Sequence, residues 1–190
     1  MNPSIFVSVS KEPGISTAER ETIRYDDFVR KLLKPLPEDL NACHIAMGLA
    51  GELGELFHAN ADEFEESGDY EFYLQAALNH YKLTIAECYP YNFTTGIDED
   101  EFVYWTGQLV DCIKREYIYN KPRELERLKE CIGTVSMYLT DSYNDMGTSH
   151  AEILQANAIK LEKRYAGLYY SDEAAIARAD KSPPEIGTGT

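Results

Sequence analysis

The chain has little positive charge, no long apolar run and no closely spaced cysteines. Its 190 residues include 33 Asp and Glu but only 18 Lys and Arg, which gives a net charge of −15. A chain of this charge repels phosphate, so nucleic acid and anionic membranes are excluded as general partners. Mimicry of DNA by the acidic surface is disfavoured, because the acidic residues are interleaved with core residues rather than gathered in one block.

No apolar run approaches the ~20 residues of a transmembrane helix, and the N-terminus lacks the basic-then-apolar order of a signal peptide. A cytoplasmic protein is therefore expected. Cys43, Cys88, Cys112 and Cys131 are far apart in the sequence, so neither a disulfide framework nor a zinc site is expected. The four histidines also lack the spacing of metal ligands.

Length and pattern predict one all-α domain. Residues 1–15 are expected to form an irregular arm, 16–180 the domain, and 181–190 a disordered tail. Within the domain, apolar residues recur at helical spacing, and prolines or glycines separate the helical segments. The expected helices cover residues 16–34, 37–66, 70–88, 99–119, 123–146, 149–165 and 172–180.

Capping residues and helix breakers set these boundaries. The segments Ser16–Glu19 and Ser149–Glu152 each read as a capping box, in which a serine hydroxyl and a glutamate satisfy backbone amides at a helix start. The second helix is expected to break at Ser67 and Gly68. The 123–146 helix is expected to stop at Gly147.

Glu52 and Glu55 form the clearest site pattern. They are three residues apart, which places both carboxylates on one helix face where a hard cation could bridge them. Gly48, Gly51 and Gly54 occupy the same turns, and each costs a solvated helix about 1 kcal/mol relative to alanine. A close helix neighbour or a ligand near the backbone would offset this cost. The alternative for the acids is a solvated acidic face.

Asn157, Lys160 and Arg164 repeat at positions i, i+3 and i+7 of the helix that follows Ser149. An amide with two cations suits phosphate oxygens, and a solvated basic face is the alternative. Many tyrosines lie between Tyr70 and Tyr119, which suits either a base-stacking pocket or partly buried packing.

The segments Gly48–Leu56 and Asn157–Tyr165 resemble the MazG-like, all-α nucleoside triphosphate pyrophosphohydrolases, and Tyr169–Arg178 is similar to the end of phage-type members. The resemblance covers about residues 40–57 and 128–180. It implies a helical bundle that hydrolyses a (d)NTP to the monophosphate and pyrophosphate with Mg²⁺ or Mn²⁺ held by acids of two helices. It also implies a homodimer or homotetramer, located in the host cytoplasm if a phage encodes the chain.

The resemblance assigns roles to individual residues. Glu52 and Glu55 match the first pair of metal ligands in the family. Asn157 and Lys160 match the phosphate-side positions, and Arg164 lies in the same block.

The second pair of metal ligands is where the chain departs from the family pattern. The family has a Glu-Glu-Leu-Gly-Asp block followed by an apolar stretch that contains Trp-Tyr-Leu. The segment aligned with this block is Glu130–Leu139, which puts Cys131 and Thr134 at the ligand positions. Both carboxylates of the family pair are therefore missing from these positions. A neutral thiol and a hydroxyl are poor replacements for them as ligands of Mg²⁺.

A substitute acid is then needed to complete the metal site. Glu130 is adjacent to the expected position and Glu126 lies one turn before it, although the cation of Arg127 opposes metal binding there. An inserted segment at about 69–122, long for the family, offers Asp111 or Glu116 instead. This segment either supplies the missing acid or covers the pocket.

Three functions follow from these observations. The first is a divergent pyrophosphohydrolase with Glu52, Glu55 and Glu130 as catalytic acids. The second is a disabled scaffold that sequesters a nucleotide or a nucleotide-derived signal, as a phage sponge against host defence. The third is an acidic inhibitor of a host protein. The hydrolase comes first because the family resemblance favours it.

Overall fold

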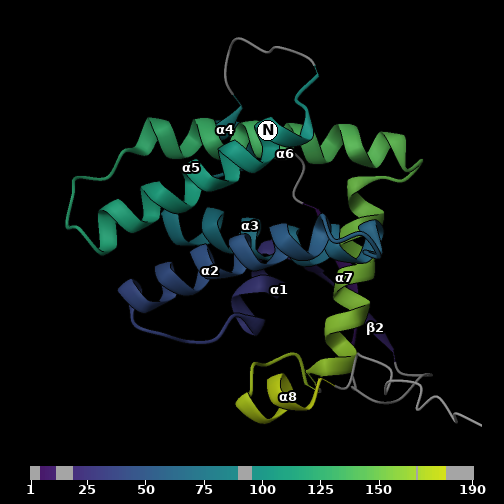
Figure 1. The fold of residues 1–190 in the computed structure, drawn as a ribbon. Coiled ribbons are helices and arrows are strands. Elements are labelled where there is room, and N and C mark those ends of the chain that lie inside the picture. Colours follow the sequence, from purple (N-terminus) through teal and green to yellow (C-terminus); the bar gives the residue numbers. More distant parts are fainter. Residues whose placement is uncertain (1–4, 12–18, 90–95, 166, 179–190) are drawn as a thin grey trace, which may run out of the picture.

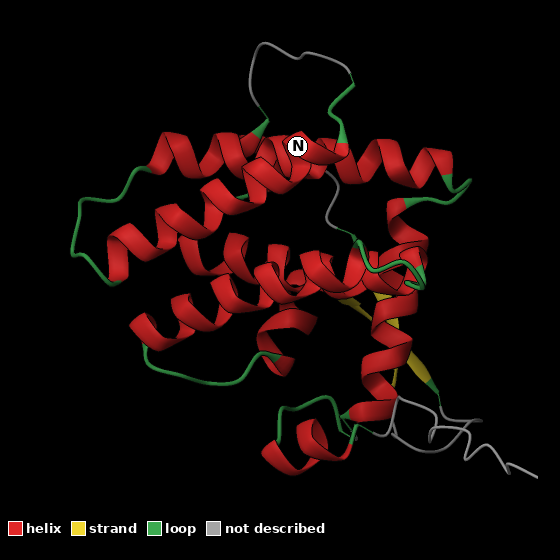
Figure 2. Ribbon diagram, viewed as in Figure 1, coloured by secondary structure: helices red, strands yellow, loops and turns green. Residues whose placement is uncertain are grey.

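The computed structural model describes residues 5–11, 19–89, 96–165 and 167–178 (Figure 1). These residues form eight helices and one two-stranded sheet, which confirms the predicted all-α class (Figure 2). The predicted tail at 181–190 lies outside the described residues. The helices are α1 (Tyr25–Leu32), α2 (Glu38–Leu56), α3 (Glu63–Tyr81), α4 (Ile85–Cys88), α5 (Glu99–Tyr117), α6 (Leu125–Asp145), α7 (His150–Arg164) and α8 (Asp172–Ala177).

The four long helices α2, α3, α5 and α6 run roughly alongside one another, and α7 crosses one end of this group (Figure 1). α2 packs against both α3 and α5, α6 packs against α5, and α7 packs against α3. Each helix contributes an apolar stripe to one core, which includes the fully buried Leu49, Tyr70, Leu109 and Ile132. The MazG-like form of the bundle stays a prediction.

The N-terminal segment differs from the predicted irregular arm. β1 (Phe6–Ser10) and β2 (Arg20–Arg24) form an antiparallel pair. On the other edge of β1, the Gln155 side chain of α7 accepts from the Ser8 N–H (2.8 Å) and donates to the Ser8 carbonyl (3.0 Å). The Gln155 side chain thus makes the hydrogen bonds that a neighbouring strand would make. The backbone N–H and carbonyl of Ser8 on this edge of β1 are therefore not left unpaired.

The first predicted helix begins later than expected. Residues 20–24 belong to β2, and α1 starts at Tyr25, whose N–H donates to the Ile5 carbonyl (3.0 Å). Pairing with β1 therefore outweighs the local helical pattern. Most of the predicted capping box at 16–19 lies outside the described residues.

The second predicted helix, 37–66, is two helices in the structure. α2 ends at Leu56, and α3 begins after Asp62, whose side chain accepts from the Glu65 N–H (3.3 Å). The predicted breakers at 67 and 68 lie inside α3, and a Cβ atom at Gly68 would lie only 3.0 Å from Cβ of Asn157. The N-cap and the close packing on α7 outweigh the low helix propensity of these two residues.

The later helices follow the sequence closely. α5, α6 and α7 match the predicted segments to within a few residues. Gly147 has a φ of +69° and ends α6 as expected. The predicted capping box of Ser149 and Glu152 is present at the start of α7. The predicted 70–88 helix instead ends at Tyr81, and a separate short α4 follows it.

Two of the sequence-based exclusions concern disulfides and membrane spans. All four cysteines are free thiols in the structure. Within the described ranges, none of the helices combines the length and the apolar character that a membrane span requires.

Candidate functional site

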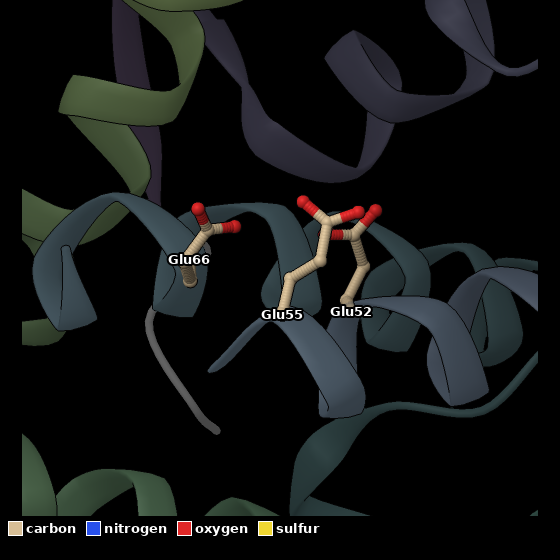
Figure 3. Close-up of side chains that lie close together, drawn as sticks. All are labelled: Glu52, Glu55 and Glu66. Carbon is tan, nitrogen blue, oxygen red and sulfur yellow. The ribbon is translucent and has the colours of Figure 1, made fainter. Parts of the chain in front are cut away.

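Three carboxylates meet where α2 and α3 pass each other. Glu52 and Glu55 come from α2 and Glu66 from α3, and each offers an oxygen within 4.8 Å of the other two. Figure 3 shows the three side chains pointing into the same space. In the part of the chain that the structure describes, this is the one group of three or more acidic, histidine or cysteine side chains so arranged. The predicted clustering of Glu52 with Glu55 is confirmed.

The chain reversal at 57–62 creates this cluster. In one continuous helix, Glu66 would lie ~21 Å along the axis from Glu52. Because the chain turns back after Leu56, α3 runs antiparallel to α2, and contacts such as that between Asn41 and His80 (3.4 Å) mark the far end of the pair. Glu66 thereby returns to the level of Glu52.

Gly48 allows α3 to come close to α2. A Cβ atom at this position would clash with the ring of Tyr73, so only glycine leaves room for the ring against the α2 backbone. The predicted close helix neighbour is therefore confirmed for Gly48. Added Cβ atoms at Gly51 and Gly54 would meet nothing within 4 Å among the described residues, so packing does not explain these two glycines.

Asp69, one turn beyond Glu66 on α3, is held by two residues of α7. Its carboxylate accepts from Nδ2 of Asn157 (3.0 Å) and pairs with the ammonium of Lys160, which also pairs with Glu65 (2.7 Å). Asn157 is 3% exposed, and its Oδ1 accepts from the Tyr25 hydroxyl (2.8 Å). Two of the three residues predicted to contact phosphate, Asn157 and Lys160, are thus engaged in orienting Asp69.

The acidic cluster is electrostatically unfavourable by itself. Burial raises the pKa of Glu52 to about 7, and the charges of Asp69, Glu55 and Glu66 add to this effect, while Lys160 opposes it. Oε2 of Glu52 is buried and has no hydrogen-bond partner among the described residues. A bound divalent cation would offset the repulsion and provide a partner for this oxygen.

The donor set fits a hard cation. All three converging groups are carboxylates, and oxygen ligands suit Mg²⁺ and Mn²⁺, whereas zinc and copper sites usually include nitrogen or sulfur. Glu52, Glu55 and Glu66 are therefore the residues that would hold such an ion, with Asp69 beside them.

Without metal, the stability of the protein is expected to fall as the pH rises toward 7. The pKa of Glu52 is about 7 in the folded protein, against an ordinary value of 4.5, so in this interval the folded state binds the proton more tightly than the unfolded state. The stabilisation is complete below about pH 4.5 and is lost as the pH passes 7. Thermal unfolding in chelator at about pH 5 and about pH 8 measures the effect, and Glu52→Gln should remove it. Equal pH dependence in both proteins would contradict the assignment.

A cavity of about 220 Å³ opens beside the acids. Glu52, Glu55 and Asp69 line it, together with rings from α3 and from the segment after α7. Its walls also carry the cations Lys34, Arg164 and Arg178. Of the three residues predicted to bind phosphate, only Arg164 lines this cavity. The space thus combines carboxylates for a cation, cations for an anion and aromatic surface.

The structure corrects the position expected for the second acidic pair. Cys131 is fully buried, the Thr134 hydroxyl donates to the Glu130 carbonyl (2.9 Å), and the Glu130 carboxylate accepts from Arg127 (2.6 Å). These residues lie on α6, which packs on α5 and α4. The acid that joins the pair on α2 is Glu66 of α3.

The missed signal is the segment Glu65–Asp69, Glu-Glu-Ser-Gly-Asp, which is followed by Tyr73 and Leu74. It has the Glu-Glu-x-Gly-Asp order expected of the second pair, with a Tyr-Leu after it. Local propensity predicts a helix end at Ser67 and Gly68, which divides this block between a helix tip and the predicted insertion. Residues 69–81 of that insertion belong to α3.

The other candidate acids pair with cations close to them in the sequence. Asp111 pairs with Lys114 (2.5 Å) and Glu116 with Arg123 (2.8 Å). Glu126 pairs with Lys129 (3.0 Å) and its side chain is 86% exposed. None of these three described acids lines the cavity beside Glu52.

Comparison of the chain with protein-family models, curated proteins and solved structures finds no match. The functional assignment therefore depends on the chemistry of the site.

Proposed function

We propose that the protein is a MazG-like, metal-dependent nucleotide pyrophosphohydrolase that converts a (d)NTP to the monophosphate and pyrophosphate. The observation that carries this proposal is the convergence of Glu52, Glu55 and Glu66 beside a cavity with basic walls. Cleavage of a phosphoanhydride requires positive charge near the phosphates and an oriented water, and a carboxylate-bound divalent ion supplies both when present.

The side chains around the cavity divide this work. Glu52, Glu55 and Glu66 would hold the cation, and Asn157 and Lys160 orient Asp69 next to them. Arg164 lines the cavity and provides a guanidinium for phosphate oxygens.

The case for a disabled nucleotide-binding scaffold rests on the apparent loss of the second acidic pair and on the aromatic inserted segment. Glu66 and Asp69 take that role in the proposed site, so the loss is no longer a reason to prefer the scaffold. The hydrolase is therefore preferred to the scaffold and to the acidic inhibitor.

The proposal is tested by incubating the purified protein with NTPs and dNTPs in the presence of Mg²⁺, Mn²⁺ or chelator. Chromatography and pyrophosphate detection should show monophosphate and pyrophosphate in a metal-dependent reaction that Glu52→Gln abolishes. Glu126→Gln, which changes an exposed acid of α6, is the matched control and should retain the wild-type rate. Intact nucleotide bound in proportion to the protein would instead indicate the scaffold.

A further inference from the structure

The segment 167–178 folds back from the end of α7 and is attached to α1 by polar contacts. The Tyr170 N–H donates to the Lys31 carbonyl (3.2 Å). Lys34 pairs with Asp172 (2.5 Å) and lies over the Tyr170 ring, 5.5 Å from its centroid, while the Tyr170 hydroxyl donates to Asp172 (2.6 Å). We call the contacts among Lys34, Tyr170 and Asp172 the C-terminal latch.

α8 adds little to the hydrophobic core. None of its residues is buried, and Ile176 is 83% exposed. Ala174 and Ala175 pack against the edge of the core while partly exposed, so the latch adds polar contacts to a limited apolar contact in positioning α8. The segment nevertheless forms part of the cavity wall through Tyr170, Ala175 and Arg178.

Arg178 is well placed for an anionic ligand. It follows α8 in a left-handed conformation with a φ of +46°, and its N–H caps the helix by donating to the Ala174 carbonyl (3.2 Å). The Lys160 ammonium, by contrast, is already bound to Asp69 and Glu65. The exposed Arg178 side chain lines the cavity and offers it a guanidinium, while the helix cap involves only the backbone N–H of this residue.

We infer that Arg178 binds phosphate oxygens of the substrate and that the C-terminal latch is the positioning device that keeps it in the cavity. The inference rests on the proposed function, because only that proposal identifies the ligand as a nucleotide. A triphosphate brings more negative charge than one divalent ion neutralises, so cations on the wall are needed in addition to those of the metal site. A guanidinium can contact two phosphate oxygens at once.

The test measures binding by calorimetry of inorganic tripolyphosphate and of nucleoside triphosphates with a non-cleavable α,β-methylene bridge, each with Mn²⁺. Arg178→Gln is expected to weaken both by ~10-fold or more, as for loss of a charged hydrogen bond, and Arg178→Lys to restore part of the affinity. Arg115→Gln is the matched control, because this exposed arginine pairs with Glu124 (2.7 Å) on another part of the surface.

The latch is tested by Asp172→Asn, which should weaken binding by roughly 3-fold. If Asp172 acts by positioning Arg178, this effect disappears in the Arg178→Gln background, and a purely structural role would leave it unchanged. Because α8 buries no side chain, these variants should fold like the wild type, as circular dichroism can verify.

Tripolyphosphate that binds wild type and Arg178→Gln equally would overturn the inference while leaving the proposed function intact. Weaker tripolyphosphate binding by Arg178→Gln in a protein that cleaves no nucleotide would support the inference and contradict the proposed function. Failure of the wild type to bind either probe would overturn the inference.

Discussion

Glu66→Gln is expected to lower the rate of pyrophosphate release by about 10³-fold. Glu66 is the α3 member of the three-carboxylate cluster, and a neutral amide removes one of the charges that would hold the divalent ion. Loss of a metal ligand removes several kcal/mol of transition-state stabilisation, and about 1.36 kcal/mol is a factor of ten in rate. The measurement is the initial rate at saturating nucleotide, together with a calorimetric titration with Mn²⁺, in which binding should weaken strongly.

Glu130→Gln provides the matched control. Glu130 is the substitute acid next to the ligand position that the family resemblance assigns to Cys131, and in the structure it pairs with Arg127 on α6. Because this substitution leaves all three clustered carboxylates unchanged, its rate and its Mn²⁺ affinity should stay near those of the wild type. The reverse result, with Glu130→Gln inactive and Glu66→Gln active, would contradict the site described above.

Gly48→Ala is expected to lower the free energy of unfolding by about 3 kcal/mol. The added methyl group would clash with the Tyr73 ring, and overpacking of this kind costs roughly 1–3 kcal/mol because ring or backbone must move. Urea denaturation measures the change. Tyr73 also lines the cavity, so the variant should lose activity even where it is folded.

Gly51→Ala is the control on the same helix. An added Cβ there meets nothing within 4 Å among the described residues, so the higher helix propensity of alanine should raise stability by about 0.5–1 kcal/mol. The double variant Gly48→Ala with Tyr73→Ala should be less destabilised than the sum of its single changes, since the clashing ring is gone. Strict additivity would show that the ring is not the cause.

Several elements could be predicted because their signals are local. The serine and glutamate that open α7 satisfy backbone amides within one turn, and Gly147 ends α6 through its own backbone conformation. The Glu52 and Glu55 side chains share a face because they are three residues apart in one helix. None of these features depends on distant parts of the chain.

Other features could not be predicted because they depend on contacts between distant segments. β1 is stabilised by β2 and by the Gln155 side chain, 147 residues beyond Ser8. Ser67 and Gly68 stay helical because α3 packs closely on α7 at this point. Local propensity favours a break at these two residues, and tertiary packing outweighs it.

The sequence by itself determined the helical class, most later helix boundaries and the first half of the acidic site, since these follow from spacing and capping within single helices. Only the tertiary structure decided which acid completes the cluster, because a reversal of a few residues brings Glu66 back to Glu52. It also assigned Asn157 and Lys160 to Asp69 and placed Arg178 at the cavity. The contacts of Asp69 and Arg178 are set by the folding of α3, α7 and α8 onto α2 and α1, whereas for Glu66 the sequence held one signal, the Glu-Glu-Ser-Gly-Asp order of residues 65–69.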